Sequence, residues 1–183
     1  HGAILRVLVV VEEHAVALFF PPLAGGQRRH PAFDVAGQRD RRWQKLAVFR
    51  ERLGDLTGPT LCLDLDLVVV DALDPFFDLP GRFFIIRDDD LFRRKPLRKL
   101  NAERDRFLHS VGNSSVFRFE IGAHRYILDA YVADPVAAAA NYEISQQFQS
   151  AQLAAHGDLH YWPSEWCVSF KNACVPRGLA SYA

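Results

Sequence analysis

The stretch that decides the fold is Thr60-Leu61-Cys62-Leu63-Asp64-Leu65-Asp66-Leu67-Val68-Val69-Val70. Its apolar run over residues 61–63 predicts a short strand that is buried on both faces. Asp64 and Asp66 follow this run, separated by one residue. Because open α/β sheets bind ligands at the carboxyl ends of their strands, we expect functional chemistry at this point of the chain.

Strands and helical segments alternate on both sides of this stretch. The β-branched run from Ile4 to Val11 predicts a buried strand, and the apolar spacing from Trp43 to Leu53 predicts a helix that stops at Gly54. Asp134-Pro135 is a typical helix start. The other expected elements are strands over 83–86 and 115–119 and helical segments over 121–132 and up to residue 157. This order predicts one α/β domain over residues 1–183, a sandwich with a mostly parallel sheet.

The composition favours a folded domain without a broad charged surface. Of 183 residues, 49% are hydrophobic, and 22 basic residues balance 22 acidic ones, so we expect neither disorder nor nucleic-acid binding. No run approaches the ~20 apolar residues of a membrane helix, and no signal peptide is evident. Three cysteines do not suggest a disulfide framework, which favours the cytoplasm. The chain starts at His1 and contains no methionine, so we expect that it lacks its natural start.

The aspartate pair is suited to a divalent cation. On extended backbone the two carboxylates point the same way and would repel each other unless a cation neutralised them. Oxygen ligands suit Mg²⁺ or Mn²⁺, which usually keep open positions for phosphate oxygens. A simpler alternative is that both side chains lie on a solvated strand end.

The same residues also resemble the opening motif of haloacid-dehalogenase-type phosphatases. That resemblance implies Asp64 as nucleophile and Asp66 as general acid/base. The family carries this motif on its first strand, whereas here a strand and a helix come earlier. It also needs a second acidic pair after a long gap, and Asp88-Asp89-Asp90 follows too soon.

Taken together, several segments resemble the nucleotide-sugar glycosyltransferases of the GT-A fold, in particular bacterial enzymes related to the glycogenin and galactosyltransferase group. The resemblance covers about residues 40–176. It rests on the D-x-D stretch with its flanks and on the order of these segments: Trp43-Gln44-Lys45-Leu46, Leu73-Asp74-Pro75-Phe76-Phe77, Asn113-Ser114-Ser115, Gln146-Gln147-Phe148 and Trp166-Cys167-Val168-Ser169-Phe170-Lys171.

The resemblance implies a GT-A-like, Rossmann-like fold and a metal-dependent transfer of sugar from a nucleoside-diphosphate sugar, most simply a UDP-sugar. Asp64 and Asp66 would bind Mn²⁺ or Mg²⁺, with His156 or His160 as a third ligand. The implied donor-binding and catalytic residues are Lys45, Asp64, Asn113, Ser114, Gln147 and Lys171. The chain departs from the family at Gln146, where relatives carry an aspartate.

Each of these residues also has a structural interpretation. Lys45 could be a solvated surface residue, and Asn113 could satisfy a turn. Asp88 could belong to a solvated loop or act as a general base toward the acceptor. The basic stretch over residues 93–99 suggests an anionic acceptor, such as a lipid-linked or surface glycan, and hence a peripheral position at the inner membrane. A catalytically inactive nucleotide-sugar binding module is a further alternative.

Overall fold

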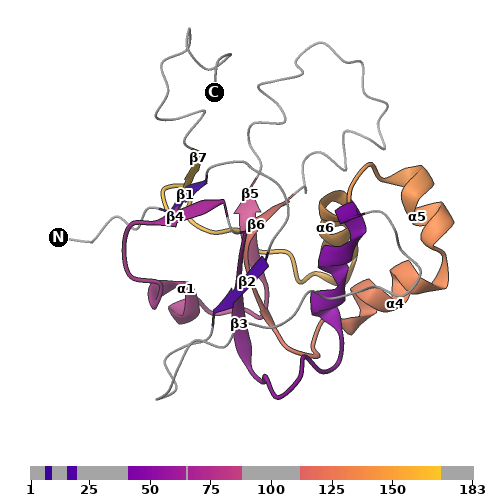
Figure 1. Cartoon of the computed structure of the whole chain (residues 1–183), viewed down its shortest axis with the longest axis horizontal. Helices are drawn as coiled ribbons and strands as arrows, with labels where there is room; N and C mark the ends of the chain where they lie inside the picture. Colours follow the sequence, from indigo (N-terminus) through magenta and orange to yellow (C-terminus); the bar gives the residue numbers. More distant parts are fainter. Residues whose placement is uncertain (1–6, 10–15, 20–40, 65, 88–111, 170–183) are drawn as a thin grey trace, which may run out of the picture.

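The computed structural model describes residues 7–9, 16–19, 41–64, 66–87 and 112–169 (Figure 1). Its helices and strands follow the order predicted around the D-x-D stretch. The elements are β1 Val7–Val9, β2 Val16–Phe19, η1 Arg41–Phe49, β3 Pro59–Asp64, β4 Leu67–Val69, α1 Pro75–Asp78, β5 Phe84–Arg87, β6 Gly112–Glu120, α4 Arg125–Ala133, α5 Pro135–Asn141, α6 Ser145–His156 and β7 Cys167–Ser169.

Two sheets organise the described residues, and they are mostly antiparallel. The larger has the order β2-β3-β6-β5, and each of its three strand pairs is antiparallel. The smaller has the order β4-β1-β7, in which only β1 and β7 are parallel. The predicted α/β class is confirmed in this broad sense, but the predicted mostly parallel sheet is wrong for these strands. An apolar run indicates that both faces of a strand are buried. It does not indicate whether the neighbouring strands run parallel or antiparallel.

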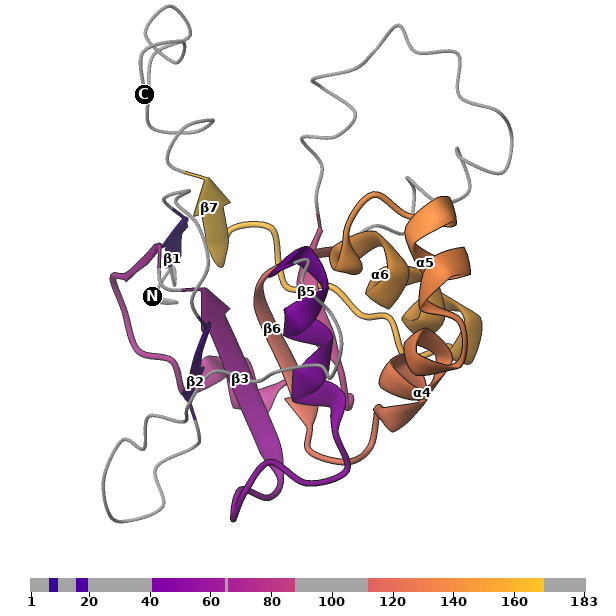
Figure 2. The same ribbon diagram turned by 45° about the vertical axis from the view of Figure 1, so that its right-hand side comes forward.

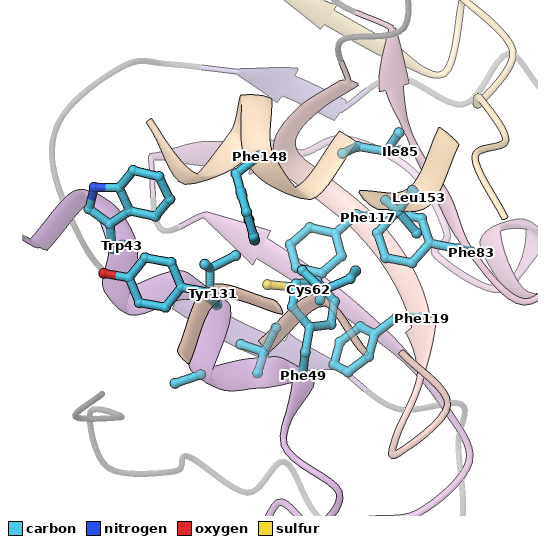
Figure 3. Packing of buried hydrophobic residues seen from close by; sticks show 14 of the residues in the cluster. Trp43, Phe49, Cys62, Phe83, Ile85, Phe117, Phe119, Tyr131, Phe148 and Leu153 are labelled. Atoms are coloured by element: carbon cyan, nitrogen blue, oxygen red, sulfur yellow. The ribbon is translucent and has the colours of Figure 1, made fainter. Parts of the chain in front are cut away.

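Both faces of the larger sheet are indeed covered. On one face, Cys62, Ile85 and Phe117 pack with residues of η1, α4 and α6, including Trp43, Tyr131 and Phe148 (Figure 3). On the other face, a second cluster joins sheet residues to α1 and the segment before β7: Leu61, Leu63, Phe76, Phe84, Val116 and Trp162. Alternate residues of β3, β5 and β6 therefore belong to two different cores, as the pleat requires.

The helices η1, α4, α5 and α6 lie on the face of the first cluster, whereas α1 lies on the other face (Figures 1 and 2). The predicted start at Asp134-Pro135 is confirmed, because the Asp134 carboxylate accepts a hydrogen bond of 2.8 Å from the Ala137 N–H. α6 ends where Gly157 adopts a left-handed conformation with φ of 72°. The predicted helix over 43–53 is instead a 3-10 helix that ends at Phe49. Within the described ranges, no helix combines the length and apolar character needed to cross a bilayer.

Arg118 links the residues around α1 to the sheet through hydrogen bonds. It is only 2% exposed, and its guanidinium donates hydrogen bonds to the carbonyl oxygens of Phe76, Leu79 and Gly81. The same group lies over the ring of Phe84, 4.8 Å from its centroid. One cation thus anchors the whole turn around α1 to the centre of β6.

Candidate functional site

Asp64 is the last residue of β3, and η1 brings Lys45 to it. η1 packs against the sheet through buried residues that include Trp43 and Leu46, which leaves Lys45 at the margin of the interface. Lys45 Nζ lies 2.6 Å from Asp64 Oδ1, and the two side chains are 20% and 22% exposed. Two residues separated by 18 others along the chain therefore form a largely buried ion pair at the carboxyl end of β3.

The electrostatics of Asp64 reflect two opposing effects. Burial raises its pKa above the usual value for aspartate, and the nearby charge of Asp66 raises it further. The Lys45 ammonium acts in the opposite direction through its charge and its hydrogen bond, but burial prevails. The carboxylate is consequently held in a costly environment, and a further cation beside it would be favourable.

β6 is irregular at the level of this ion pair. Asn113 pairs with Ile86 of β5, but the next pair in register is Phe117 with Ile85, so residues between them bulge out of the ladder. β6 pairs with β3 only from Val116 onward. The backbone groups of Ser114 and Ser115 must therefore find partners outside the sheet.

Side chains supply those partners. Asn113 Oδ1 accepts the Ser115 N–H at 2.9 Å, and Gln146 Oε1, from the first turn of α6, accepts the Ser114 N–H at 3.0 Å. The carbonyl oxygen of Ser114 accepts a hydrogen bond of 3.2 Å from Lys45 Nζ. The bulge thus joins η1, β6 and α6 around the ammonium that faces Asp64.

The structure brings four of the predicted residues together and adds one. Lys45, Asp64, Asn113 and Ser114 converge, and Asn113 fills the role of a turn-satisfying side chain that was its structural alternative. Gln146 joins them, although the resemblance assigned a role to its neighbour Gln147. Asp66 lies close enough for its charge to affect Asp64.

Gln147 and His156 are engaged elsewhere. Gln147 Oε1 accepts the Glu143 N–H at 3.0 Å, before the start of α6. His156 is ten residues beyond Gln146 on the same helix, about 15 Å along its axis at ~1.5 Å per residue. Its ring stacks on Tyr126 at 3.8 Å, and its Nδ1 lies 2.8 Å from the Gln152 carbonyl oxygen. The structure therefore does not bring His156 to the aspartates.

His160 also lies away from Asp64. The centroid of its ring lies 5.3 Å from that of Phe84, at the start of β5. Phe84 and Leu61 of β3 both pair with Arg118 of β6, so they stand at the same height in the sheet. Asp64 is three residues farther along, about 10 Å at ~3.3 Å per residue. Asp88 and Lys171, two further predicted site residues, lie outside the described residues.

The donor set at this strand end is compatible with a divalent cation that shares its coordination with a ligand. No group of three or more histidine, cysteine, aspartate or glutamate side chains able to hold a metal occurs in the described part of the chain. Mg²⁺, however, is commonly held by one or two carboxylates together with phosphate oxygens and water. In such an arrangement Asp64 and Asp66 would be the protein ligands.

Gln146 is the residue of this site to which the sequence assigned no role. The signal that could have found it was its place in Gln146-Gln147-Phe148, at the position where the resembling glycosyltransferases carry an aspartate. Comparison of the chain with protein-family models, with curated proteins and with solved structures found no match.

Proposed function

We propose that this chain binds a nucleoside-diphosphate sugar, most simply a UDP-sugar, together with Mn²⁺ or Mg²⁺, and transfers the sugar to an acceptor. The observation that carries the proposal is the convergence of Lys45, Asp64 and Ser114 at the carboxyl end of β3. These residues come from three of the segments that resemble GT-A glycosyltransferases. A GT-A-like arrangement of the whole chain belongs to the same proposal, as does an acceptor among bacterial surface glycans.

Charge at the strand end supports a role for the metal in nucleotide binding. Asp64 and Asp66 contribute two negative charges and Lys45 one positive charge, which leaves the group negative and repulsive toward a diphosphate. A divalent cation makes the same group positive. The nucleotide is therefore expected to bind only with the metal, whereas the metal binds without the nucleotide. When bound, the cation would stabilise the negative charge of the leaving diphosphate.

Calorimetry with UDP and Mn²⁺ tests the proposal. The wild-type chain should bind UDP in the presence of Mn²⁺ and show no heat when EDTA removes the metal. Asp66→Asn should abolish metal-dependent binding. Asp71→Asn is the matched control, because that exposed carboxylate lies just beyond β4 and bonds only its neighbour's N–H in the described structure. Absence of heat from the wild type with UDP and Mn²⁺ would contradict the proposal.

Lys45→Met provides a sharper test of the charge argument. Removal of the ammonium takes a positive charge away from Asp64, so Mn²⁺ should bind more tightly than to the wild type. The metal-loaded group then carries less positive charge, and UDP should bind more weakly. These opposite shifts distinguish a charge-balanced diphosphate site from simple damage to the fold, which would weaken both.

The two alternatives give different results in the same samples. A phosphatase would hydrolyse a generic phosphate ester in the presence of Mg²⁺, and Asp64→Asn would abolish that turnover. An inactive nucleotide-sugar module would bind UDP and Mn²⁺ but release no free UDP from a UDP-sugar, even with a panel of glycan acceptors. A thermal-shift screen of nucleotides and sugars with Mn²⁺ selects the donor for these assays.

A further inference from the structure

We propose that Gln146 is a positioning residue, which holds Lys45 against Asp64 by fixing the bulged backbone of Ser114. The importance of this arrangement for donor binding rests on the proposed function above. The positioning itself is a property of the chain and can be measured without any nucleotide.

The bulge creates the need for Gln146. Asn113 pairs with β5 before the bulge, and Val116 is the first residue that pairs with β3. Ser114 lies between them and takes part in no strand pairing among the described residues. Ser114 is only 5% exposed, which keeps water from serving instead. Gln146 Oε1 accepts this N–H at 3.0 Å and lies 3.4 Å from the Ser114 hydroxyl. A single side-chain oxygen therefore fixes both the backbone and the hydroxyl of Ser114.

Ser114 passes this constraint to Lys45. Its carbonyl oxygen and its hydroxyl lie 3.2 Å and 3.5 Å from Lys45 Nζ. A lysine side chain is long and flexible, and holding it in one place costs side-chain entropy. With Ser114 fixed, the ammonium has two preformed partners beside the third, Asp64 Oδ1 at 2.6 Å. Gln146 thus acts on Lys45 without contacting it in any hydrogen bond of the described structure.

The neutral charge of the Gln146 amide also suits it to positioning Lys45. A carboxylate there could accept the same N–H, but it would add a negative charge within two hydrogen bonds of Lys45. The neutral amide leaves Asp64 as the carboxylate that holds the ammonium. Gln146 therefore fixes the geometry of the ion pair without changing its net charge.

The test measures the acylation rate of Lys45 in the full chain, by brief treatment with an amine-reactive acetyl ester and mass spectrometry of the peptide that contains Lys45. Lys45 reacts only after its side chain is released and its ammonium has lost a proton to solvent, because the neutral amine attacks the acetyl ester and expels the alcohol part of the ester. The loss of one hydrogen bond of ordinary strength raises the released population roughly fivefold. Gln146→Leu and Gln146→Met should each raise the rate by about this factor. Gln146→Glu retains an acceptor and should react no faster than the wild type.

Gln147→Leu is the matched control. It makes the same substitution one residue away and also removes an acceptor of a backbone N–H, that of Glu143. Its Lys45 rate should equal that of the wild type. Equal rates in Gln146→Leu, Gln146→Met and the wild type would overturn the proposal, as would an equal increase in Gln147→Leu. All rates are taken well below the melting temperature of the least stable variant.

Calorimetry of the same variants separates this inference from the proposed function. If wild-type UDP and Mn²⁺ binding is present, Gln146→Leu should weaken the binding of UDP without weakening that of Mn²⁺, since the proposed role of Lys45 is toward the diphosphate. If the wild type binds no nucleotide, the proposed function fails, while the acylation rates still decide whether Gln146 positions Lys45.

Discussion

Replacement of Arg118 by methionine should be the most destabilising single change on the α1 side of the sheet. The variant leaves the carbonyl oxygens of Phe76, Leu79 and Gly81 without their common donor. Phe76 is fully buried, so leaving its carbonyl oxygen without a donor lowers the free energy of unfolding by ~1–3 kcal/mol. The other two carbonyls belong to more exposed residues and can recover water, at a cost of ~0.5–1.5 kcal/mol each.

Aromatic contacts add to this loss, and burial of the charge offsets part of it. The guanidinium lies 4.8 Å from the ring centroid of Phe84 and 5.9 Å from that of Trp162, contacts of ~0.5–1 kcal/mol each. Burial of a cation is itself costly, as the lowered pKa of Arg118 shows, and methionine avoids that cost. The expected net loss is ~2–4 kcal/mol, a large share of a typical domain's stability.

Urea unfolding followed by tryptophan fluorescence measures this loss. Arg82→Met is the control, because Arg82 forms an ion pair with Glu120 in which the side chains are 63% and 46% exposed. Such a pair contributes less than ~1 kcal/mol. Arg118→Lys keeps the charge but not the planar fork, and should fall between the two. A loss below ~1 kcal/mol in Arg118→Met, no greater than in Arg82→Met, would refute the reasoning.

Three further predictions concern the helical side of the sheet. Gln149→Leu should stabilise the chain by ~1–2 kcal/mol in urea unfolding, because the amide is 1% exposed and, within the described structure, has no hydrogen-bond partner. Asp134→Ala should cost ~1 kcal/mol by loss of the helix cap to Ala137, measured by thermal unfolding. Burial lowers the pKa of His124 below 6.5, despite Asp158 nearby, so stability should fall as pH drops below 6.5, and His124→Gln should flatten this dependence in urea titrations at several pH values.

The sequence predicted the elements better than their arrangement. Local chemistry specifies the strand that ends at Asp64 and the cap at Asp134, because each depends on a few adjacent residues. Strand direction depends on which distant segments pair. Leu61 and Leu63 face one core and Cys62 the other, an apolar run that fits a parallel or an antiparallel sheet covered on both faces. The mostly parallel prediction was wrong for this reason.

Within the site, the sequence identified residue types but not the phase of α6. Gln146 and Gln147 are chemically identical, and adjacent residues on a helix point about 100° apart. The packing of Phe148 against Trp43 and Tyr131, together with the hydrogen bond from the Gly112 N–H to Ser150 Oγ, sets which glutamine faces β6. The contact between Lys45 and Asp64 was equally inaccessible, because it depends on how η1 docks on the sheet.

β6 explains why the candidate site lies where it does. From Val116 onward the strand pairs with β3, at Phe117 and Arg118 it also pairs with β5, and it supplies residues to both cores. Before that residue, the bulge releases backbone groups from the ladder, and those groups can then orient charged side chains. The carbonyl oxygen of Ser114, for example, accepts a hydrogen bond from Lys45 Nζ. β6 therefore combines a regular half, which supports the core, with a bulged half, which supports a polar site. The bulge lies at the end of β3 where Asp64 is located.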